Sequence, residues 1–258
     1  GLAREIGAIT SKRVNYPKIS KISPTKNKIS ISIEDKKDCG CYIATLIQQA
    51  TISNSTIAIQ EKLSSVGLKA ISNAVDVTNF VLMEQGQPLH AFDYDKVQGG
   101  KIVVRRAKQG EKIVTIDGIE RQLDPSILVI ADTQKPIAIA GIMGGKETEV
   151  TASTKNVLLE AAHFDMTLVR RASRKLGLRS DSSYRFERNV NIEGVLMGAN
   201  RATDLIIELT KGKVTARSEN GALKKKTLNT IKISAQDVEN RLGNTISTAQ
   251  IKKFLTAL

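Results

Sequence analysis

The sequence predicts a mixed α+β fold: a mixed or antiparallel sheet domain with flanking helices, followed by part of a small winged-helix-like domain. Segments with strand character concentrate in the middle of this 258-residue chain, and segments with helical spacing lie before and after them. Two short helices predicted at the C-terminal end resemble half of a helix-turn-helix or winged-helix unit. The length favours one large domain, or one large domain and one small one.

The strands are predicted from alternating or continuous apolar residues. Ile29, Ile31 and Ile33 alternate with polar residues, and Asp117-Gly118 predicts a tight turn between two short strands. The predicted strands cover residues 29–33, 101–107, 111–116, 128–131, 137–140 and 157–164. The apolar segment that ends at Thr78-Asn79 is also strand-like, and His90 is expected in a turn that leads into HAFD.

Helices are predicted where apolar residues recur at helical spacing between capping residues. Asp165 is a candidate N-cap, Gly177 ends the helix that follows it, and Gly212 closes a long amphipathic helix. Ser234 and Ser247 each begin a capping box. The predicted helices cover residues 1–10, 57–66, 166–176 and 191–210, and two more begin after these serines.

Three parts of the chain differ in composition and in the structure that they are expected to form. Residues 1–36 are predicted as a short helix and a polar, basic linker, residues 37–212 as the main domain, and residues 213–258 as a linker and a partial small domain. The chain begins without Met and stops within a helix-like segment, which suggests a piece of a longer polypeptide.

The charge and composition indicate a partner. A formal charge of +13 and a pI near 9.7 favour association with nucleic acid; a solubility surface or a basic face for an acidic protein is the alternative. With no Trp and few other aromatic residues, backbone and shape contacts are favoured over base stacking. No apolar stretch is long enough to cross a bilayer and no signal peptide is evident, so a cytoplasmic location without membrane partners is expected. Cys39 and Cys41 are expected to be reduced and structural, without a metal.

Two residues are candidates for chemistry. Glu160 lies in a strand with apolar neighbours on both faces, so it either pairs with an arginine or acts as a pocket acid that hydrogen-bonds a ligand. Its face is shared with Leu158, Ala162 and Phe164. His90 is either a structural residue or a site residue, and Asp93 is positioned to orient it.

Two further segments extend the candidate site. The glycines of AGIMGG, residues 140–145, either let backbone N–H groups approach a ligand or form a plain tight turn. Arginines of residues 170–188 either form a solvated face or bring cations beside Ser180-Asp181-Ser182-Ser183, where an RNA end would present phosphates and an ester. No Ser-His-Asp or metal-ligand pattern is present.

Taken together, these segments resemble the B3/B4 region of the bacterial phenylalanyl-tRNA synthetase beta subunit. The matching pieces are GLAREIGAIT, NAVDVTNFVLMEQGQPLHAFD, KIVVRRAKQGEKIVTIDG, LVIAD, IAIAGIMGG, NVLLEAAHFD and RRASRKLGLRSDSSYRFER. The similarity spans most of residues 37–212, and residues 228–258 are similar to the beginning of the B5 domain. The resemblance implies a portion of a longer beta chain whose alpha subunit, in an α2β2 enzyme, handles phenylalanine and ATP with Mg²⁺. This portion is therefore expected to bind no cofactor or metal and not to aminoacylate.

In that family the B3/B4 domain hydrolyses tyrosine wrongly attached to tRNA(Phe), and the resemblance implies roles for individual residues here. Glu160 is expected to bind the tyrosine hydroxyl with help from the backbone at Ala140 and Gly141, and His90 and Asn79 to position the water or the terminal ribose. The other implied residues are Thr78, Ser180 and Ser182 for the substrate and Arg170, Arg171, Arg174, Lys175 and Arg179 for tRNA.

Two departures from the family pattern bear on this hypothesis. Ser180 and Ser182 stand where the family has Thr and Ala, which changes the size and polarity of a pocket wall. Asn189 stands where Gly follows RFER, and Asn tolerates positive φ. The leading hypothesis is therefore an editing hydrolase, and the alternative is a non-catalytic scaffold that docks tRNA and neighbouring domains.

Overall fold

The computed structural model describes residues 1–22, 25–221 and 230–258, which form two compact units. One unit combines Gly1–Lys18 with Lys225–Leu258, and the other comprises Ile19–Lys224. The described helices are α1 Leu2–Thr10, α2 Ile57–Ser65, α3 Asn73–Gln85, α4 Met166–Lys175, α5 Asp181–Phe186, α6 Ile192–Thr210, α7 Ala235–Leu242 and α8 Thr248–Ala257. The described strands are β1 Ser30–Ile33, β2 Cys39–Gln48, β3 Leu89–Asp93, β4 Lys101–Arg106, β5 Lys112–Val114, β6 Glu120–Gln122, β7 Leu128–Ala131, β8 Pro136–Ile139, β9 Met143–Gly144, β10 Val157–Phe164 and β11 Lys213–Gly221.

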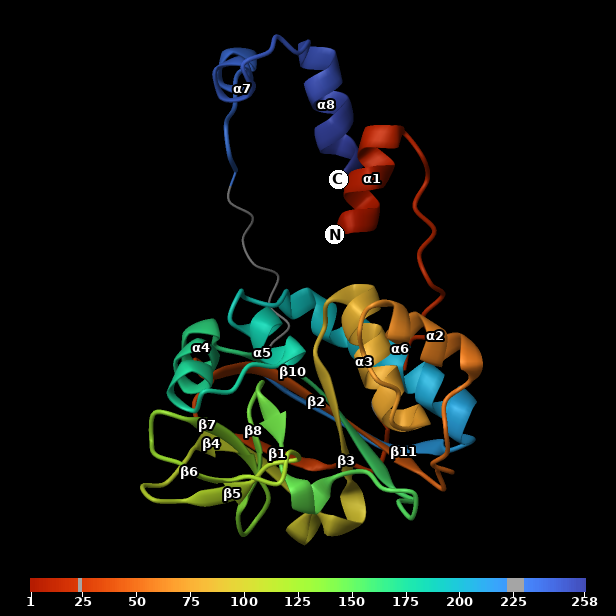
Figure 1. Ribbon diagram of the computed structural model, residues 1–258, viewed down its shortest axis with the longest axis vertical. Coiled ribbons are helices and arrows are strands. Elements are labelled where there is room, and N and C mark those ends of the chain that lie inside the picture. Colours follow the sequence, from red (N-terminus) through yellow and green to blue (C-terminus); the bar gives the residue numbers. More distant parts are fainter. Residues whose placement is uncertain (23–24, 222–229) are drawn as a thin grey trace. The chain divides into compact units, whose positions relative to one another are not determined.

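The larger unit contains two packed sheets with helices on the outer face of one of them (Figure 1). One sheet has the order β1-β4-β7-β8-β9 and the other β11-β2-β10-β3; β5 and β6 form a separate hairpin. Only β1 and β4 pair in parallel among the described strands of these sheets. The predicted mixed α+β fold is confirmed.

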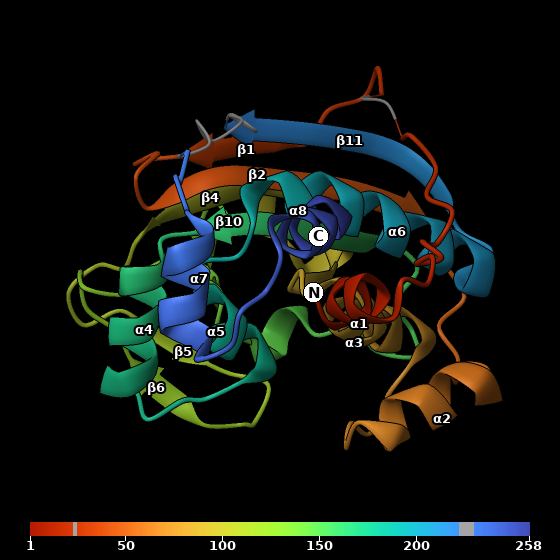
Figure 2. The ribbon, with the colours of Figure 1, turned by 90° about the horizontal axis from the view of Figure 1, so that it is seen from above.

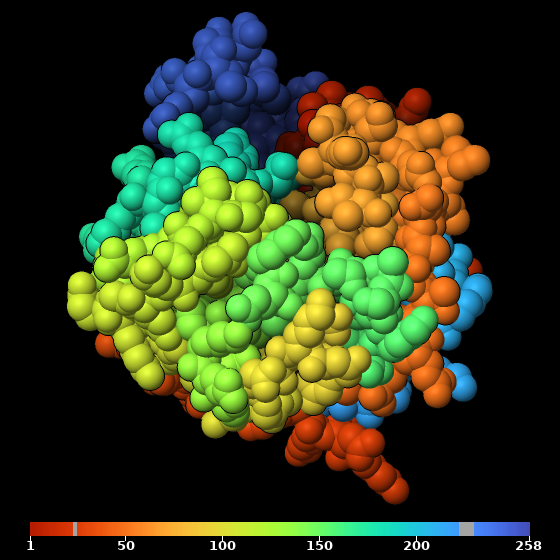
Figure 3. Space-filling view, turned by 60° about the horizontal axis from the view of Figure 1, so that its bottom comes forward, coloured from red at the N-terminus to blue at the C-terminus, as the bar shows by residue number. Residues whose placement is uncertain are grey.

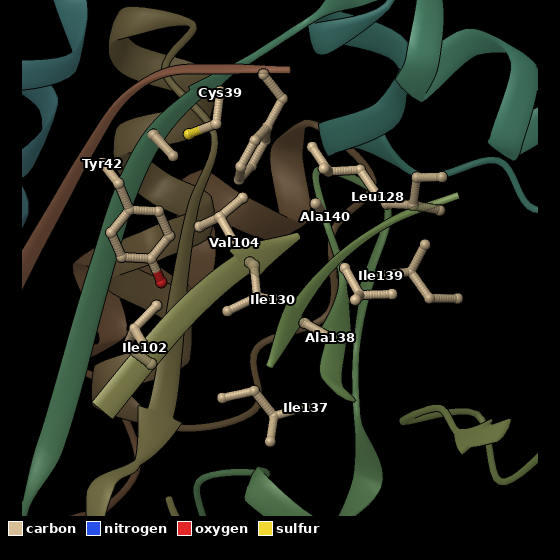
Figure 4. Close-up of a cluster of buried hydrophobic side chains, with 14 of the residues drawn as sticks. Cys39, Tyr42, Ile102, Val104, Leu128, Ile130, Ile137, Ala138, Ile139 and Ala140 are labelled. Carbon is tan, nitrogen blue, oxygen red and sulfur yellow. The ribbon is translucent and has the colours of Figure 1, made fainter. Parts of the chain in front are cut away.

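The main hydrophobic core lies between the two sheets. Tyr42 from one sheet meets Ile102, Val104 and Ile130 from the other (Figure 4). Leu158 belongs to the same cluster, and all five residues are buried. The alternation of strand β10 explains this arrangement, because successive side chains point to opposite faces. The predicted face of Glu160, shared with Leu158, Ala162 and Phe164, is confirmed, since these three apolar residues all belong to the core between the sheets.

A second core lies on the other face of the four-stranded sheet, under α3 and α6. Ile43 and Leu159 from the sheet pack there with Val77, Ala199 and Ile206 from the helices. Viewed from above, α6 follows the direction of β2 and β10 (Figure 2). In the space-filling view the yellow-to-green stretch, which contains β4 to β9, forms one continuous face beside orange α2 and α3 (Figure 3).

Most predicted elements are present with bounds close to those expected. The strands at residues 128–131 and 157–164, the Asp165 cap of α4 and the tight turn at Gly118, with φ 80°, agree with the prediction. The two cysteines of β2 are buried and unbonded, as expected, and burial raises the pKa of the Cys41 thiol to about 11.

Three predictions are wrong. The segment ending at Thr78-Asn79 is helix α3 and not a strand, because its buried residues recur at helical spacing between Ser72 and Gly86, which adopts φ 79°. His90 lies within strand β3 and not in a turn, because its backbone pairs with β10. Residues 213–221, expected as linker, form β11, since Ala216 and Arg217 are buried against β2. Residues 222–229 of that expected linker lie outside the described residues, as do residues 23 and 24.

The smaller unit consists of α1, α7 and α8. The predicted capping boxes are present: the hydroxyl of Ser234 accepts from the N–H of Asp237, and that of Ser247 from the N–H of Gln250. Helix α1 packs against α8 within this unit.

Candidate functional site

The site is built on the strand pair β3 and β10. His90 and Glu160 are direct cross-strand partners in this antiparallel pair, so both side chains project from the same face of the sheet. That face looks towards the five-stranded sheet. On the same face of β3, Phe92 packs edge-on against the imidazole of His90, with ring centroids 4.5 Å apart. Two titratable groups distant in sequence are thereby brought together.

His90 and Glu160 line a partly open cavity of ≈ 50 Å³. Its walls come from the start of β3, from β7 and β8, from the turn into β9, and from α5. The lining residues are Pro88, Leu89, His90, Ile130, Ala138, Ile139, Gly141, Ile142, Met143, Gly144, Glu160, Ser182 and Phe186. Most of the lining residues are therefore apolar, and His90, Glu160 and Ser182 supply the polar side chains.

Glu160 is the buried polar group of this cavity, with 5% of its surface exposed. Burial raises the pKa of its carboxyl to about 8, although a hydrogen bond from Tyr42 opposes this shift. The Tyr42 hydroxyl donates to Oε2 at 3.1 Å. No arginine among the described residues pairs with Glu160, so the pocket-acid interpretation is the one that the geometry favours.

His90 is held as a neutral imidazole. Desolvation lowers its pKa to about 4, although the negative charge of Glu149 opposes this shift. The ring Nε2 has no hydrogen-bond partner among the described residues. Asp93 does not orient this ring, contrary to expectation, because its carboxylate accepts from Thr154 at 2.7 Å and pairs with Lys96.

The glycines of residues 140–145 serve close packing. A Cβ at Gly144 would lie 2.5 Å from Nε2 of His90, so the imidazole occupies the space that a side chain would fill. Gly141 adopts φ 70°, and a Cβ there would approach Phe186 to 2.9 Å. Glycine is thus required at both positions by the shape of the cavity.

Helix α5 carries the serine-rich segment. Ser180 is its N-cap: its hydroxyl accepts from the N–H of Ser183 and donates to the carbonyl of Ile142 at 2.8 Å. Ser182 lies two residues further on and lines the cavity. Asn189, which follows this helix, adopts φ 67°, in agreement with the expected tolerance of positive φ.

The structure brings some of the expected site residues together and leaves others apart. His90, Gly141, Glu160 and Ser182 line one cavity, whereas Thr78, Asn79, Ala140 and Ser180 are not among its lining residues. Thr78 and Asn79 lie on α3, where the Thr78 hydroxyl donates to the carbonyl of Val75. Ala140 is buried in the core behind the wall.

Four of the expected tRNA-binding residues lie on helix α4, which packs against α5, and Arg179 lies just beyond its end. Arg170, Arg171, Arg174 and Arg179 are exposed, and the first three line a surface cavity of ≈ 300 Å³. Lys175 is engaged differently, since its ammonium lies 2.5 Å from a carboxylate oxygen of Asp124. The exposed arginines of α4 therefore lie next to α5, the helix that supplies Ser182 and Phe186 to the cavity.

Sequence reasoning missed Tyr42, Met143 and Phe186 as residues of the site. Phe186 follows the polar serine run, and its position within RFER gives no sign that it faces a cavity. Tyr42 lies in β2, which was not predicted as a strand, so nothing in the local pattern placed its hydroxyl beside Glu160.

The fold is that of an α+β domain with a partly open cavity, and comparison with known proteins identifies its family. Residues 38–211 match the B3/4 domain family, and the chain belongs to that family.

The relatives of the chain are more specific. It is 44% identical to the phenylalanine–tRNA ligase beta subunit of Moorella thermoacetica, over the whole chain and 32% of that protein. It is 48% identical to the phenylalanine–tRNA ligase beta subunit of Aquifex aeolicus, over 83% of the chain and 27% of that protein. The chain thus spans about a third of the length of these relatives, and the predicted resemblance to the beta subunit is confirmed.

A solved structure shows the same fold. An N-terminal fragment of the phenylalanyl-tRNA synthetase beta subunit from Pyrococcus horikoshii matches with a TM-score of 0.51 and 14% identity. The match covers 93% of this chain and 67% of that fragment. Among the described residues of our chain, no helix has the length and apolarity needed to span a membrane.

Proposed function

We propose that the cavity is an editing site, which hydrolyses the ester of tyrosine mischarged to tRNA(Phe) within a phenylalanine–tRNA ligase. The observation that carries this proposal is the single buried carboxyl of Glu160 in an otherwise apolar wall, opposite His90. An apolar cavity accepts an aromatic ring, and one buried polar group favours a ring that bears a hydroxyl.

A second site of this kind solves a selectivity problem. An apolar synthetic pocket rejects an isostere with one additional hydroxyl by only about a hundredfold. A site that hydrogen-bonds the hydroxyl rejects the analogue without it by about 10⁴-fold, because its own polar group is then left unpaired. In this proposal the carboxyl of Glu160 is the group that hydrogen-bonds the hydroxyl of the tyrosyl group.

The reaction is attack by water on the ester carbonyl. The bond between the carbonyl carbon and the ribose oxygen breaks, the ribose oxygen takes up a proton, and tyrosine leaves as the free amino acid. His90, with a pKa of about 4, is a weak base and acts through the unpartnered Nε2, which orients the attacking water or the terminal ribose. The terminal hydroxyl of the tRNA assists in the proton transfer.

The tRNA end extends beyond the cavity. Asn79 is half-buried on α3, which packs against β3, and is the proposed contact for the terminal ribose. The arginines of α4 bind phosphates of the same RNA end, next to the helix that lines the cavity.

The parent ligase extends this proposal to partners outside the cavity. Its alpha subunit, in an α2β2 assembly, would use ATP and Mg²⁺ for aminoacylation. The described residues of this chain contain no group of three His, Cys, Asp or Glu side chains suited to a metal, so no step of the editing reaction is assigned to one here.

The test is deacylation of tyrosyl-tRNA(Phe) by the full chain, with phenylalanyl-tRNA(Phe) as the competing substrate. Glu160→Ala is expected to abolish the preference for the tyrosyl ester, and His90→Ala to slow both esters about a hundredfold because the water is no longer oriented. Glu147→Ala is the matched control and should change neither, because Glu147 is exposed and does not line the cavity.

Binding of the tRNA is tested separately from hydrolysis. Joint replacement of Arg170, Arg171 and Arg174 by Ala should reduce the slope of log affinity against log salt by about 2, since each phosphate contact contributes about 0.7–0.9. Hydrolysis that is unchanged by Glu160→Ala would contradict the assigned recognition of tyrosine. Absence of hydrolysis in the full-length beta subunit, with tRNA binding intact, would favour the scaffold.

A further inference from the structure

Tyr42 is a buried residue that contacts Glu160 on the side away from the cavity. Tyr42 lies on β2, the strand next to β10, and its hydroxyl is 3.1 Å from Oε2 of Glu160. None of its surface is exposed, so the substrate cannot contact it without rearrangement. Figure 4 shows its ring between the two sheets, near Ile102 and Val104.

The hydrogen bond from Tyr42 makes the two carboxyl oxygens of Glu160 inequivalent. Oε2 accepts from Tyr42, whereas no described residue donates to Oε1, and the side chain lines the cavity. A phenol has one proton to donate, so this contact fixes which carboxyl oxygen is turned away from the ligand. Without it, rotation of the terminal bond of Glu160 would exchange the two oxygens, because such torsions are broad and roughly two-fold.

We propose that Tyr42 is a positioning and specificity-determining residue, which holds Glu160 with Oε1 towards the cavity so that the para-hydroxyl of a tyrosyl group completes its hydrogen bonding. This inference rests on the proposed editing function. A phenylalanyl group in the same cavity leaves Oε1 unpaired, and the penalty is full only when the carboxyl cannot turn to another partner. Tyr42 therefore acts on selectivity through Glu160, without touching the substrate.

The surroundings of the pair support this role. The other titratable groups that face Glu160 are His90 from β3 and Cys39 from β2; the facing residues of β7 and β8 are apolar. Burial and the nearby Glu160 raise the pKa of Tyr42 well above its ordinary value, so its hydroxyl remains a donor throughout the neutral range. The hydrogen bond from Tyr42 also lowers the pKa of Glu160, which gives a readout independent of packing.

The experiment compares Tyr42→Phe with the unchanged chain, using tyrosyl-tRNA(Phe) and phenylalanyl-tRNA(Phe) as substrates. Removal of one hydroxyl is expected to lower the ratio of the two kcat/KM values about tenfold, the effect of losing one hydrogen bond to a carboxyl group. The same change made in a Glu160→Ala background, which lacks the acceptor of the Tyr42 hydrogen bond, should alter the ratio less than about twofold if the two residues act as a unit. Tyr94→Phe is the matched control, because that hydroxyl lies beside Gly100.

A second readout is the pH dependence of the ratio. In a plot of this ratio of kcat/KM values against pH, the change on the alkaline side should occur at higher pH for Tyr42→Phe than for the unchanged chain. The reason is that the Glu160 pKa of about 8 rises further without the hydrogen-bond donor. If Tyr42→Phe does not fold, incorporation of 3-fluorotyrosine at this position keeps the ring and strengthens the donor. That substitution should shift the change on the alkaline side in the opposite direction.

The outcomes separate this proposal from the proposed function. If the unchanged chain shows no preference for the tyrosyl ester, the editing function fails and the role of Tyr42 fails with it. If the preference is present but Tyr42→Phe retains it, or slows both esters equally, the editing function stands and Tyr42 is only a packing residue.

Discussion

Replacement of Glu160 by Gln is expected to remove a large part of the pH dependence of the stability of this domain. The folded state holds the carboxyl proton up to a pKa of about 8, whereas the unfolded chain releases it near 4.5. Between these values the folded state binds more protons, so the free energy of unfolding falls as the pH rises. The pKa difference corresponds to about 5 kcal/mol at alkaline pH, since one pKa unit is about 1.4 kcal/mol.

The assay is urea unfolding, monitored by circular dichroism, at several pH values between pH 5 and pH 8. Gln preserves the shape of the side chain and accepts the Tyr42 hydrogen bond, but it has no proton to release. The free energy of unfolding of the variant should therefore stay flat where that of the unchanged chain declines. Glu147→Gln, which alters an exposed carboxylate, should follow the unchanged chain.

His90 is expected to lower the free energy of unfolding at acidic pH, as Glu160 does at alkaline pH. Its folded pKa of about 4 lies below the ordinary value of 6.5, so the unfolded chain binds the extra proton and stability falls with acidification across this window. His90→Asn should remove about 3 kcal/mol of this loss. Parallel curves for the unchanged chain and Glu160→Gln across the whole range would refute the reasoning, because they would mean that Glu160 is not desolvated.

Three further substitutions test the geometry of the site. Gly144→Ala should slow the proposed deacylation about a hundredfold, because its Cβ would displace the ring of His90, while unfolding free energy falls by only about 1–3 kcal/mol; normal hydrolysis would show that the ring position is unimportant. Ser180→Ala should destabilise the domain by about 1–2 kcal/mol in urea unfolding, whereas Ser180→Thr, which keeps the cap, should cost less than about 0.5 kcal/mol. Asn189→Ala should cost about 1 kcal/mol at its positive φ and Asn189→Gly should not, and equal unfolding midpoints for the two would contradict a conformational cause.

The elements predicted correctly are those whose signals are local. The strand at residues 157–164 and helix α4 each carry their own pattern, alternation in one and an Asp165 cap in the other. Helix α3 was misjudged because its β-branched residues favour strands when considered alone. Its burial against α6 and β3 outweighs that preference, and burial depends on segments far away in the chain.

The same distinction applies to the site. His90 and Glu160 were placed in one pocket through the resemblance of their motifs to a known family, and the strand register explains the proximity. Tyr42 could not be predicted, because its position beside Glu160 depends on the strand order β11-β2-β10-β3. Non-local strand pairing leaves no mark in the residues adjacent to Tyr42.

The protonation of the cavity bears on which ligands it can hold. Near pH 7 desolvation keeps both Glu160, with a pKa of about 8, and His90, with a pKa of about 4, predominantly neutral. A neutral pair in an apolar wall offers hydrogen bonds without a net charge, so a charged side chain would lose its hydration there and gain no counter-ion. A neutral ring with a single hydroxyl has no such cost. The exposed arginines of α4 place positive charge outside the cavity, so in the proposed function affinity for RNA and selectivity for the amino acid would arise from separate surfaces.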